Sequence, residues 1–110
     1  MIYSLIIPIF NEERILPKLI DKLHELNNKK VEIIIIDDGS NDGTKDILRN
    51  NNQFIIKHNK YNLGKGASIL KGLELASAKN IILMDGDLEI DINDIQKLII
   101  HYEKDRKSVV

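Results

Sequence analysis

Four short runs of apolar, mostly β-branched residues divide the chain and constrain its fold more than any other feature. They cover residues 2–9, 31–37, 54–58 and 81–85. Within each run the apolar residues are nearly continuous instead of alternating with polar ones. Strands with this composition are covered on both faces, as in parallel sheets flanked by helices. The runs therefore predict four parallel strands inside an α/β domain.

Helical patterns fill the segments between these runs. Residues 15–26 place apolar side chains at a period of 3.6 residues. Pro17 suits only the first turn of a helix, so we expect this helix to begin near residues 13–16. Two further helices are predicted over residues 44–50 and 64–78.

The last part of the chain predicts one more helix and the start of one more strand. Apolar residues between 92 and 102 have helical spacing, with Asp91 as a suitable N-cap. Residues 107–110 have the composition of a fifth strand, which indicates that the natural protein is longer. Four strands alternating with four helices imply right-handed crossovers and a doubly wound, mostly parallel sheet of the Rossmann-like kind.

Length and composition narrow the class of protein. The chain has 110 residues, enough for one domain spanning 1–110, and its net charge of −1 gives no basic field for nucleic acid. It contains no cysteine, which fits a reducing compartment and favours a cytoplasmic location. No apolar run approaches the roughly 20 residues that span a bilayer, and the N-terminal run is predicted to be a strand, not a signal peptide.

Polar residues follow the predicted strands at the ends where open α/β sheets bind ligands. Glu12, Asp38 and the pair Asp85 and Asp87 come after three different strands, and Lys65 lies between two glycines at the start of the third helix. Carboxylates gathered at one edge repel one another unless a cation compensates them.

A divalent metal is the simplest compensating cation. Asp85 and Asp87 offer the hard oxygen ligands that Mg²⁺ and Mn²⁺ prefer, and these metals commonly also take substrate phosphates. Gly86 lets the backbone turn between the two carboxylates, and Glu89 is a candidate third ligand. The three histidines lie on different elements, so we expect no metal role for them.

Each of these motifs also has an ordinary structural explanation. Residues 37–40 have the composition of a turn, Asn11 and Glu12 that of a helix start, residues 63–68 that of a loop, and residues 85–87 that of another turn. The functional interpretation depends on their convergence at one edge of the predicted sheet.

Four motifs in sequence order resemble the family 2 glycosyltransferases, which have the GT-A fold. "SLIIPIFNEE" (4–13) resembles the opening strand and its Pro-x-Tyr/Phe-Asn-Glu motif, and "EIIIIDDGSNDGT" (32–44) resembles the second-strand motif. "NLGKGASILKGLELA" (62–76) resembles the Asn-x-Gly-Lys-Gly segment, and "IILMDGDLE" (81–89) lies where the family has Asp-x-Asp. The pattern is most similar to enzymes that make polyprenyl- or dolichyl-phosphate hexoses, although Glu89 replaces their usual Gln.

The resemblance implies a role for each matching residue. Pro8, Phe10 and Glu12 would border the nucleotide, Ile36 and Asp38 would contact its base, and Asp85 would lie near the ribose and the metal. Asp87 would be the main ligand of Mn²⁺ or Mg²⁺ on the diphosphate. The implied nucleotide-sugar-binding set is completed by Lys65 and Gly86, and the implied metal set is Asp85, Asp87 and Glu89.

The implied activity is metal-dependent, inverting transfer of a hexose from a UDP- or GDP-sugar to a lipid phosphate or saccharide acceptor. The family's acceptor-binding part, with the carboxylate base that hydroxyl acceptors need, would follow residue 110. We therefore expect this chain to bind the donor and to transfer sugar poorly. The full-length protein is expected to be cytoplasmic, with membrane association at the cytoplasmic face.

Three other classes share some of these features. Residues 81–89 resemble the opening of haloacid-dehalogenase-type phosphatases, with Asp85 as nucleophile and Asp87 as acid, but that motif belongs on a first strand. A phosphoacceptor receiver domain would need an Asp after the third strand, where this chain has residues 57–59. A non-catalytic α/β interaction module would self-associate through an open sheet edge, for instance at Val109 and Val110.

Overall fold

A computed structural model describes residues 2–27 and 30–85 of the chain. The helix predicted over 92–102 and the strand predicted at 107–110 lie outside the described residues, as do Gly86, Asp87 and Glu89.

The described residues form a four-stranded parallel sheet with three helices, as the alternating runs predicted. The strands are β1 (Tyr3–Ile9), β2 (Val31–Asp37), β3 (Ile55–His58) and β4 (Asn80–Leu83). The helices are α1 (Leu16–Leu26), α2 (Thr44–Arg49) and α3 (Lys65–Leu75). Pro17 lies in the first turn of α1, as expected. The strand order in the sheet is β3-β2-β1-β4, and all three pairings are parallel.

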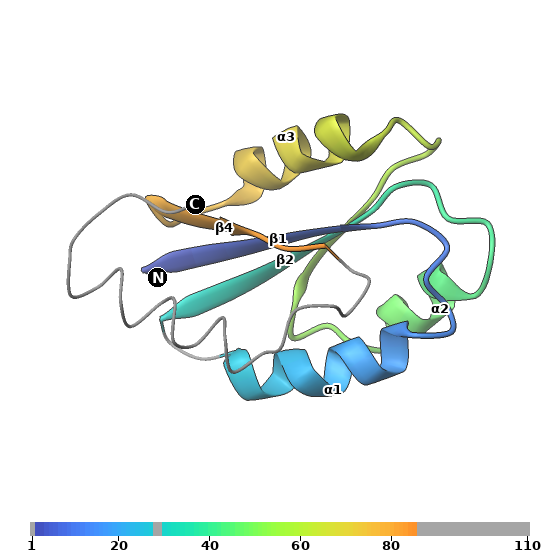
Figure 1. The fold of residues 1–110 in the computed structure, drawn as a ribbon, viewed down its shortest axis with the longest axis horizontal. Coiled ribbons are helices and arrows are strands. Elements are labelled where there is room, and N and C mark those ends of the chain that lie inside the picture. Colours follow the sequence, from blue (N-terminus) through green and yellow to red (C-terminus); the bar gives the residue numbers. More distant parts are fainter. Residues whose placement is uncertain (1, 28–29, 86–110) are drawn as a thin grey trace.

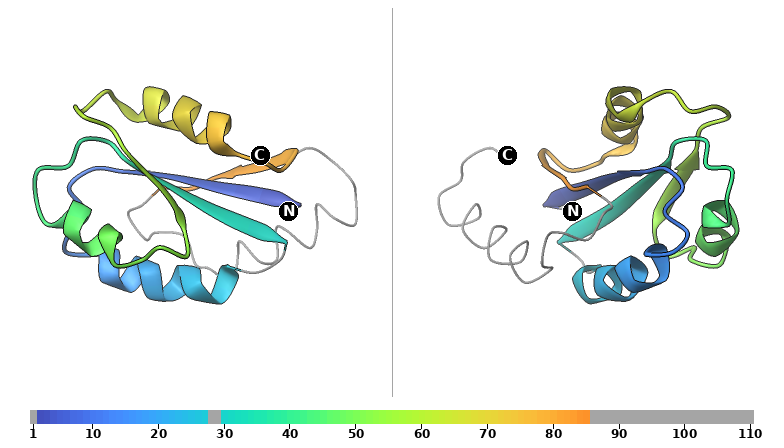
Figure 2. Two further views of the ribbon diagram at one scale, coloured as in Figure 1. Left: turned by 180° about the vertical axis from the view of Figure 1, so that it is seen from behind. Right: turned by 45° about the vertical axis from the view of Figure 1, so that its right-hand side comes forward.

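Helices cover both faces of the sheet, with α1 and α2 on one face and α3 on the other (Figures 1 and 2). Alternate residues of β1 face opposite layers, because successive side chains of a strand point to opposite faces. Leu5, Ile7 and Ile9 join the larger core beneath α1 and α2, whereas Ile6 joins the smaller core on the α3 side. Burial on both faces explains the continuous apolar runs of β1 and β2, whereas β3 and β4, at the two ends of the strand order, are only partly buried, contrary to the expectation from their composition.

Helix α3 packs very close to the sheet through a glycine. A Cβ atom added at Gly72 would lie 2.5 Å from Cγ2 of Ile6. Because glycine has no side chain at this position, α3 can approach β1 this closely. On its outer side α3 leaves Leu70 and Leu73 exposed, and Leu83 is exposed on the neighbouring edge strand β4.

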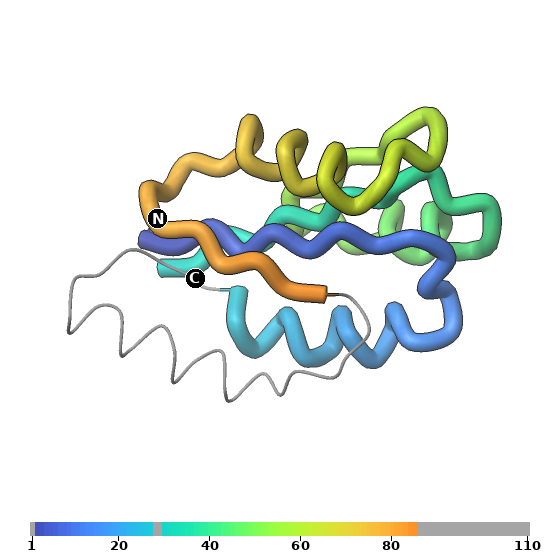
Figure 3. Tube along the Cα trace, turned by 45° about the horizontal axis from the view of Figure 1, so that its top comes forward, coloured from blue at the N-terminus to red at the C-terminus, as the bar shows by residue number. Residues whose placement is uncertain are grey.

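The course of the chain creates a switch point at one end of the sheet. From β1 the chain moves outward through α1 to β2 and through α2 to β3, and α3 then carries it back to β4 on the other side of β1 (Figure 3). In open α/β sheets, ligands bind at the carboxyl ends of the strands beside such a reversal. The carboxyl ends of β1 and β4 are therefore the place to look for a site.

A buried carboxylate ties the opposite end of the sheet together. Glu32, near the start of β2, is 8% exposed, and its Oε2 accepts hydrogen bonds from Ser4 Oγ, from the Ser77 backbone N–H at 2.6 Å and from Ser77 Oγ at 2.7 Å. Burial alone would raise the pKa of Glu32, but these hydrogen bonds outweigh it, so the pKa is lowered. The carboxylate thereby fixes the connection from α3 to β4.

Candidate functional site

A cleft of about 430 Å³ opens at the carboxyl ends of β1 and β4, at the switch point of the sheet. Six residues predicted from the sequence line it together: Pro8, Phe10, Glu12, Asp38, Lys65 and Asp85. Ile36 does not line it, because its side chain is fully buried with Ile6 and Ile34. The structure adds Ile9, Asn62 and Gly64 to the lining.

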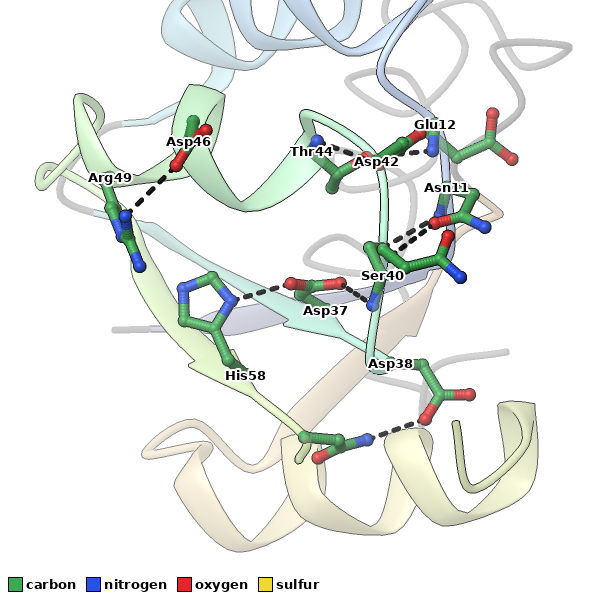
Figure 4. Close-up of polar contacts among 12 residues, drawn as sticks. Asn11, Glu12, Asp37, Asp38, Ser40, Asp42, Thr44, Asp46, Arg49 and His58 are labelled. Carbon is green, nitrogen blue, oxygen red and sulfur yellow. Dashed lines mark hydrogen bonds and ion pairs between the residues drawn. The ribbon is translucent and has the colours of Figure 1, made fainter. Parts of the chain in front are cut away.

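The loop after β1 is held by the loop after β2 through hydrogen bonds that involve backbone N–H groups. Asn11 adopts a left-handed backbone conformation with φ of 51°, and its Oδ1 accepts a bond from the Asn41 N–H at 2.9 Å. The Asn11 N–H donates to Ser40 Oγ at 2.9 Å (Figure 4). The Glu12 N–H donates to Thr44 Oγ1 at 3.1 Å. These bonds fix the backbone between Phe10 and Glu12, two residues of the cleft wall.

The two adjacent aspartates after β2 serve different parts of the molecule. Asp37 is fully buried; its Oδ2 pairs with Nδ1 of His58 at 2.8 Å, and its Oδ1 accepts the Ser40 N–H at 3.0 Å (Figure 4). Asp38 points instead toward the segment that leads into α3. The pairing of His58 with Asp37 was not predicted, because nothing local in the sequence connects residues 21 positions apart.

Asp38 lies at the cleft with both carboxylate oxygens hydrogen-bonded. Oδ1 accepts bonds from the Leu63 N–H at 2.8 Å and from Asn59 Nδ2 at 2.9 Å, and Oδ2 accepts the Gly64 N–H at 2.9 Å. Burial alone would raise the pKa of Asp38, but the bonds from Leu63, Asn59 and Gly64 outweigh it and lower the pKa. The side chain is therefore a charged acceptor around which the segment 59–64 is ordered.

The lowered pKa values of Asp38 and Glu32 predict the pH dependence of stability. Their ordinary values are 3.8 and 4.5, so near and below these values the unfolded chain binds more protons than the folded one. The stabilisation is fully present above the ordinary values and is lost as pH falls through the lower, folded values. Urea unfolding between pH 6 and pH 3, a window set by the ordinary carboxyl pKa of about 4, should show this decline.

A shallower decline in the Asp38→Asn and Glu32→Gln variants would confirm the assignment. A decline as steep as that of the wild type in both variants would contradict it.

Lys65 and Asp85 form an ion pair at the cleft wall. Lys65 is the first residue of α3 and Asp85 follows β4, and the two side chains are 61% and 53% exposed. An ion pair this exposed contributes about 1 kcal/mol or less to stability. Both side chains line the cleft, and the positive partner of the Asp85 carboxylate is the Lys65 ammonium group.

The described residues contain only part of the predicted metal site. No group of three or more potential ligands gathers among residues 2–27 and 30–85. Asp85 is the one predicted ligand in this part, since Asp87 and Glu89 lie outside it. Its half-exposed carboxylate, already paired with an ammonium group, fits a divalent cation in donor chemistry. Within the described part, no helix is long and apolar enough to cross a membrane.

The fold and the site together define the class of protein. It is an open α/β domain with an acidic cleft at the switch point of its sheet. The chain belongs to glycosyl transferase family 2, whose family profile matches residues 4–110. This match confirms the resemblance found in the four motifs, and the GT-A fold with it. It leaves the phosphatase, receiver-domain and interaction-module alternatives without support.

Individual proteins agree with the assignment. The chain is 34% identical to a dolichyl-phosphate beta-glucosyltransferase of Trichomonas vaginalis, over 97% of this chain and 36% of that protein. It matches glucosyl-3-phosphoglycerate synthase from Mycobacterium tuberculosis, solved with UDP, with a TM-score of 0.73, 25% identity, and coverage of 89% of this chain and 38% of that one. A mannosyltransferase from Pyrobaculum calidifontis, solved with GDP-Man and Mn²⁺, matches in fold with a TM-score of 0.72, 18% identity, and coverage of 88% and 31%. The chain spans about a third of the length of the curated relatives it matches.

Proposed function

We propose that this chain is the nucleotide-sugar-binding part of an inverting glycosyltransferase that transfers a hexose to a lipid phosphate such as polyprenyl phosphate. Membership of family 2 supports the reaction class, and the dolichyl-phosphate glucosyltransferase relative supports the acceptor class. Action on a lipid phosphate would bring the full-length protein to the cytoplasmic face of a membrane. The acceptor-binding part is expected from the remaining two thirds of such a protein, so these residues alone should bind donor and transfer little.

The observation that carries this proposal is the cleft, which gathers an aromatic side chain, carboxylates and a lysine at the switch point of the sheet. Phe10 and Pro8 would lie against the base or ribose, with Asp38 within reach of a ring N–H. Ile36 would act on the base only through packing beneath the cleft, since its side chain is buried. Lys65 and Asp85 would flank the diphosphate, one as a cation and the other toward the ribose and the metal.

A divalent cation, Mn²⁺ or Mg²⁺, would be held by Asp85, Asp87 and Glu89, with Gly86 allowing the turn between the two aspartates. Bound there, it would neutralise charge on the leaving nucleoside diphosphate. The GDP-Man and Mn²⁺ complex of the Pyrobaculum mannosyltransferase is consistent with such a cofactor.

Self-association through an open sheet edge is also part of the proposal. Among the described strands β4 lies at one end of the sheet, and its Leu83 is exposed. Size-exclusion chromatography tests this association.

Calorimetry with UDP and GDP, each with Mn²⁺ and with EDTA, tests the proposed function. We expect saturable binding of at least one of the two nucleotides and a loss of about tenfold or more in affinity without metal. UMP, which lacks the second phosphate, is the matched control ligand and should bind more weakly than UDP. A folded chain that binds neither nucleotide, or that binds equally well in EDTA, would contradict the proposal.

A further inference from the structure

We propose that Asp38 is a positioning residue for the diphosphate end of the cleft, acting through the turn that leads into α3. This role is additional to any contact with the base, and it rests on the proposed function, because it assumes that a diphosphate binds beside Lys65. The observation that carries it is that both oxygens of Asp38 are used by this turn.

The backbone of the turn is bound to Asp38 at two successive positions. The N–H groups of Leu63 and Gly64 donate to different carboxylate oxygens at 2.8 and 2.9 Å. Asn59, which is 2% exposed, donates its Nδ2 both to Asp38 and to Ser68 Oγ of α3 at 3.1 Å. Asp38 itself is only 4% exposed. Most of its hydrogen-bonding capacity therefore faces the turn and not the cleft.

The turn positions the residues that would meet a diphosphate. Gly64 is the N-cap of α3, Lys65 is the next residue, and both line the cleft together with Asn62. A carboxylate that fixes the Gly64 N–H fixes the backbone one residue away from the Lys65 side chain. Hydrogen bonds to a charged group are among the stronger ones in proteins, so loss of the charge should release this part of the chain.

A second contact between the same two loops holds only the part of the turn that precedes Leu63. A Cβ atom at Gly39 would lie 2.4 Å from the carbonyl carbon of Tyr61, so the segment 61–62 crosses directly over the residue after Asp38. Loss of the Asp38 bonds would free the backbone at Leu63 and Gly64, which lies beyond this crossing and leads to Lys65. Displacement of Lys65 from the cleft wall is the expected consequence.

The test is the binding of two probes, UDP and inorganic pyrophosphate, each with Mn²⁺, to Asp38→Asn. If Asp38 positions the turn, both probes should bind about tenfold or more weakly, since the loss falls on the diphosphate that they share. If Asp38 acts only on the base, UDP binding should weaken while pyrophosphate binding stays at the wild-type value. That second result would overturn the inference.

Glu32→Gln is the matched control. Glu32 is also a buried carboxylate that accepts a backbone N–H, but it lies at the opposite end of the sheet. The Glu32→Gln variant should lose stability, as Asp38→Asn does, while its affinity for both probes stays at the wild-type value. Loss of pyrophosphate binding in this control would show that general destabilisation explains the effect, which would also overturn the inference.

A second variant keeps the inference testable if Asp38→Asn does not fold. Asn59→Ala removes a donor to Asp38 but leaves the carboxylate in place, so it should weaken pyrophosphate binding several-fold; unchanged binding would count against the inference. Amide hydrogen exchange gives an independent readout, since the Leu63 and Gly64 amides should exchange faster in either variant. If the wild type binds neither probe, the proposed function fails, while the exchange measurement still tests the role of Asp38.

Discussion

Gly39→Ala is expected to lower the free energy of unfolding by about 2–5 kcal/mol, the largest effect on stability that we predict for a single methyl group. Gly39 has a φ of +73°, a left-handed conformation that costs alanine about 1–2 kcal/mol. The added Cβ would also lie 2.4 Å from the Tyr61 carbonyl carbon and 2.6 Å from the Asn62 nitrogen. Both neighbours are backbone atoms, so the loops must separate to admit the methyl group.

Gly64→Ala is the comparison for this prediction, because Gly64 has a different conformation that essentially only glycine adopts, with ψ of 160°, and lacks the steric contact. Gly64 has a φ of +100°, but an added Cβ would meet nothing within 4 Å. We expect it to cost about 1–3 kcal/mol from backbone strain alone. Urea unfolding of both variants measures the two losses, and a Gly39→Ala loss of no more than the about 1–2 kcal/mol of left-handed strain would show that the loops separate freely at this crossing.

Asp85→Asn is expected to weaken Mn²⁺-dependent UDP binding by at least about tenfold and to leave stability nearly unchanged. The substitution keeps the size of the side chain but removes the charge that pairs with Lys65 and would hold the metal. Because both side chains of the pair are more than half exposed, the fold depends little on it. Calorimetry with UDP and Mn²⁺ measures the binding, and thermal unfolding measures the stability.

Asp46→Asn provides the matched control for Asp85→Asn. Asp46 also forms an exposed ion pair, with Arg49 on α2, and does not line the cleft. It changes the net charge by the same amount, so UDP binding should stay at the wild-type value. Equal losses in both variants would mean that overall charge, not a site at Asp85, controls binding.

The fold could be predicted largely because burial on both faces of a strand gives the sequence a distinct composition. All four strands and three helices were found within a few residues of their predicted positions. The difference at the end of α3 has a long-range cause. Helix α3 was predicted to reach residue 78 but ends at Leu75, where Glu32 binds the N–H and hydroxyl of Ser77 from 45 residues away. No local pattern contains that contact.

The candidate site was predictable where residues follow strand ends directly, because topology brings those ends together. Glu12, Asp38 and Asp85 were predicted in this way, and all three line the cleft. The sequence did not reveal which contacts hold these residues in place. The bond between Asn11 and Asn41 joins residues 30 positions apart, and the bond from Asn59 to Asp38 joins residues 21 positions apart. Ile36 was assigned to the site from the resemblance, and its side chain lies in the core.

A crystal structure of the protein with UDP and Mn²⁺ would show whether the cleft at the ends of β1 and β4 is the donor site. We expect the base beside Phe10, the diphosphate between Lys65 and Asp85, and the metal on Asp85, with the bonds from Leu63 and Gly64 to Asp38 retained. A nucleotide bound away from the cleft at the ends of β1 and β4, or held there without contact to either Lys65 or Asp85, would contradict this expectation.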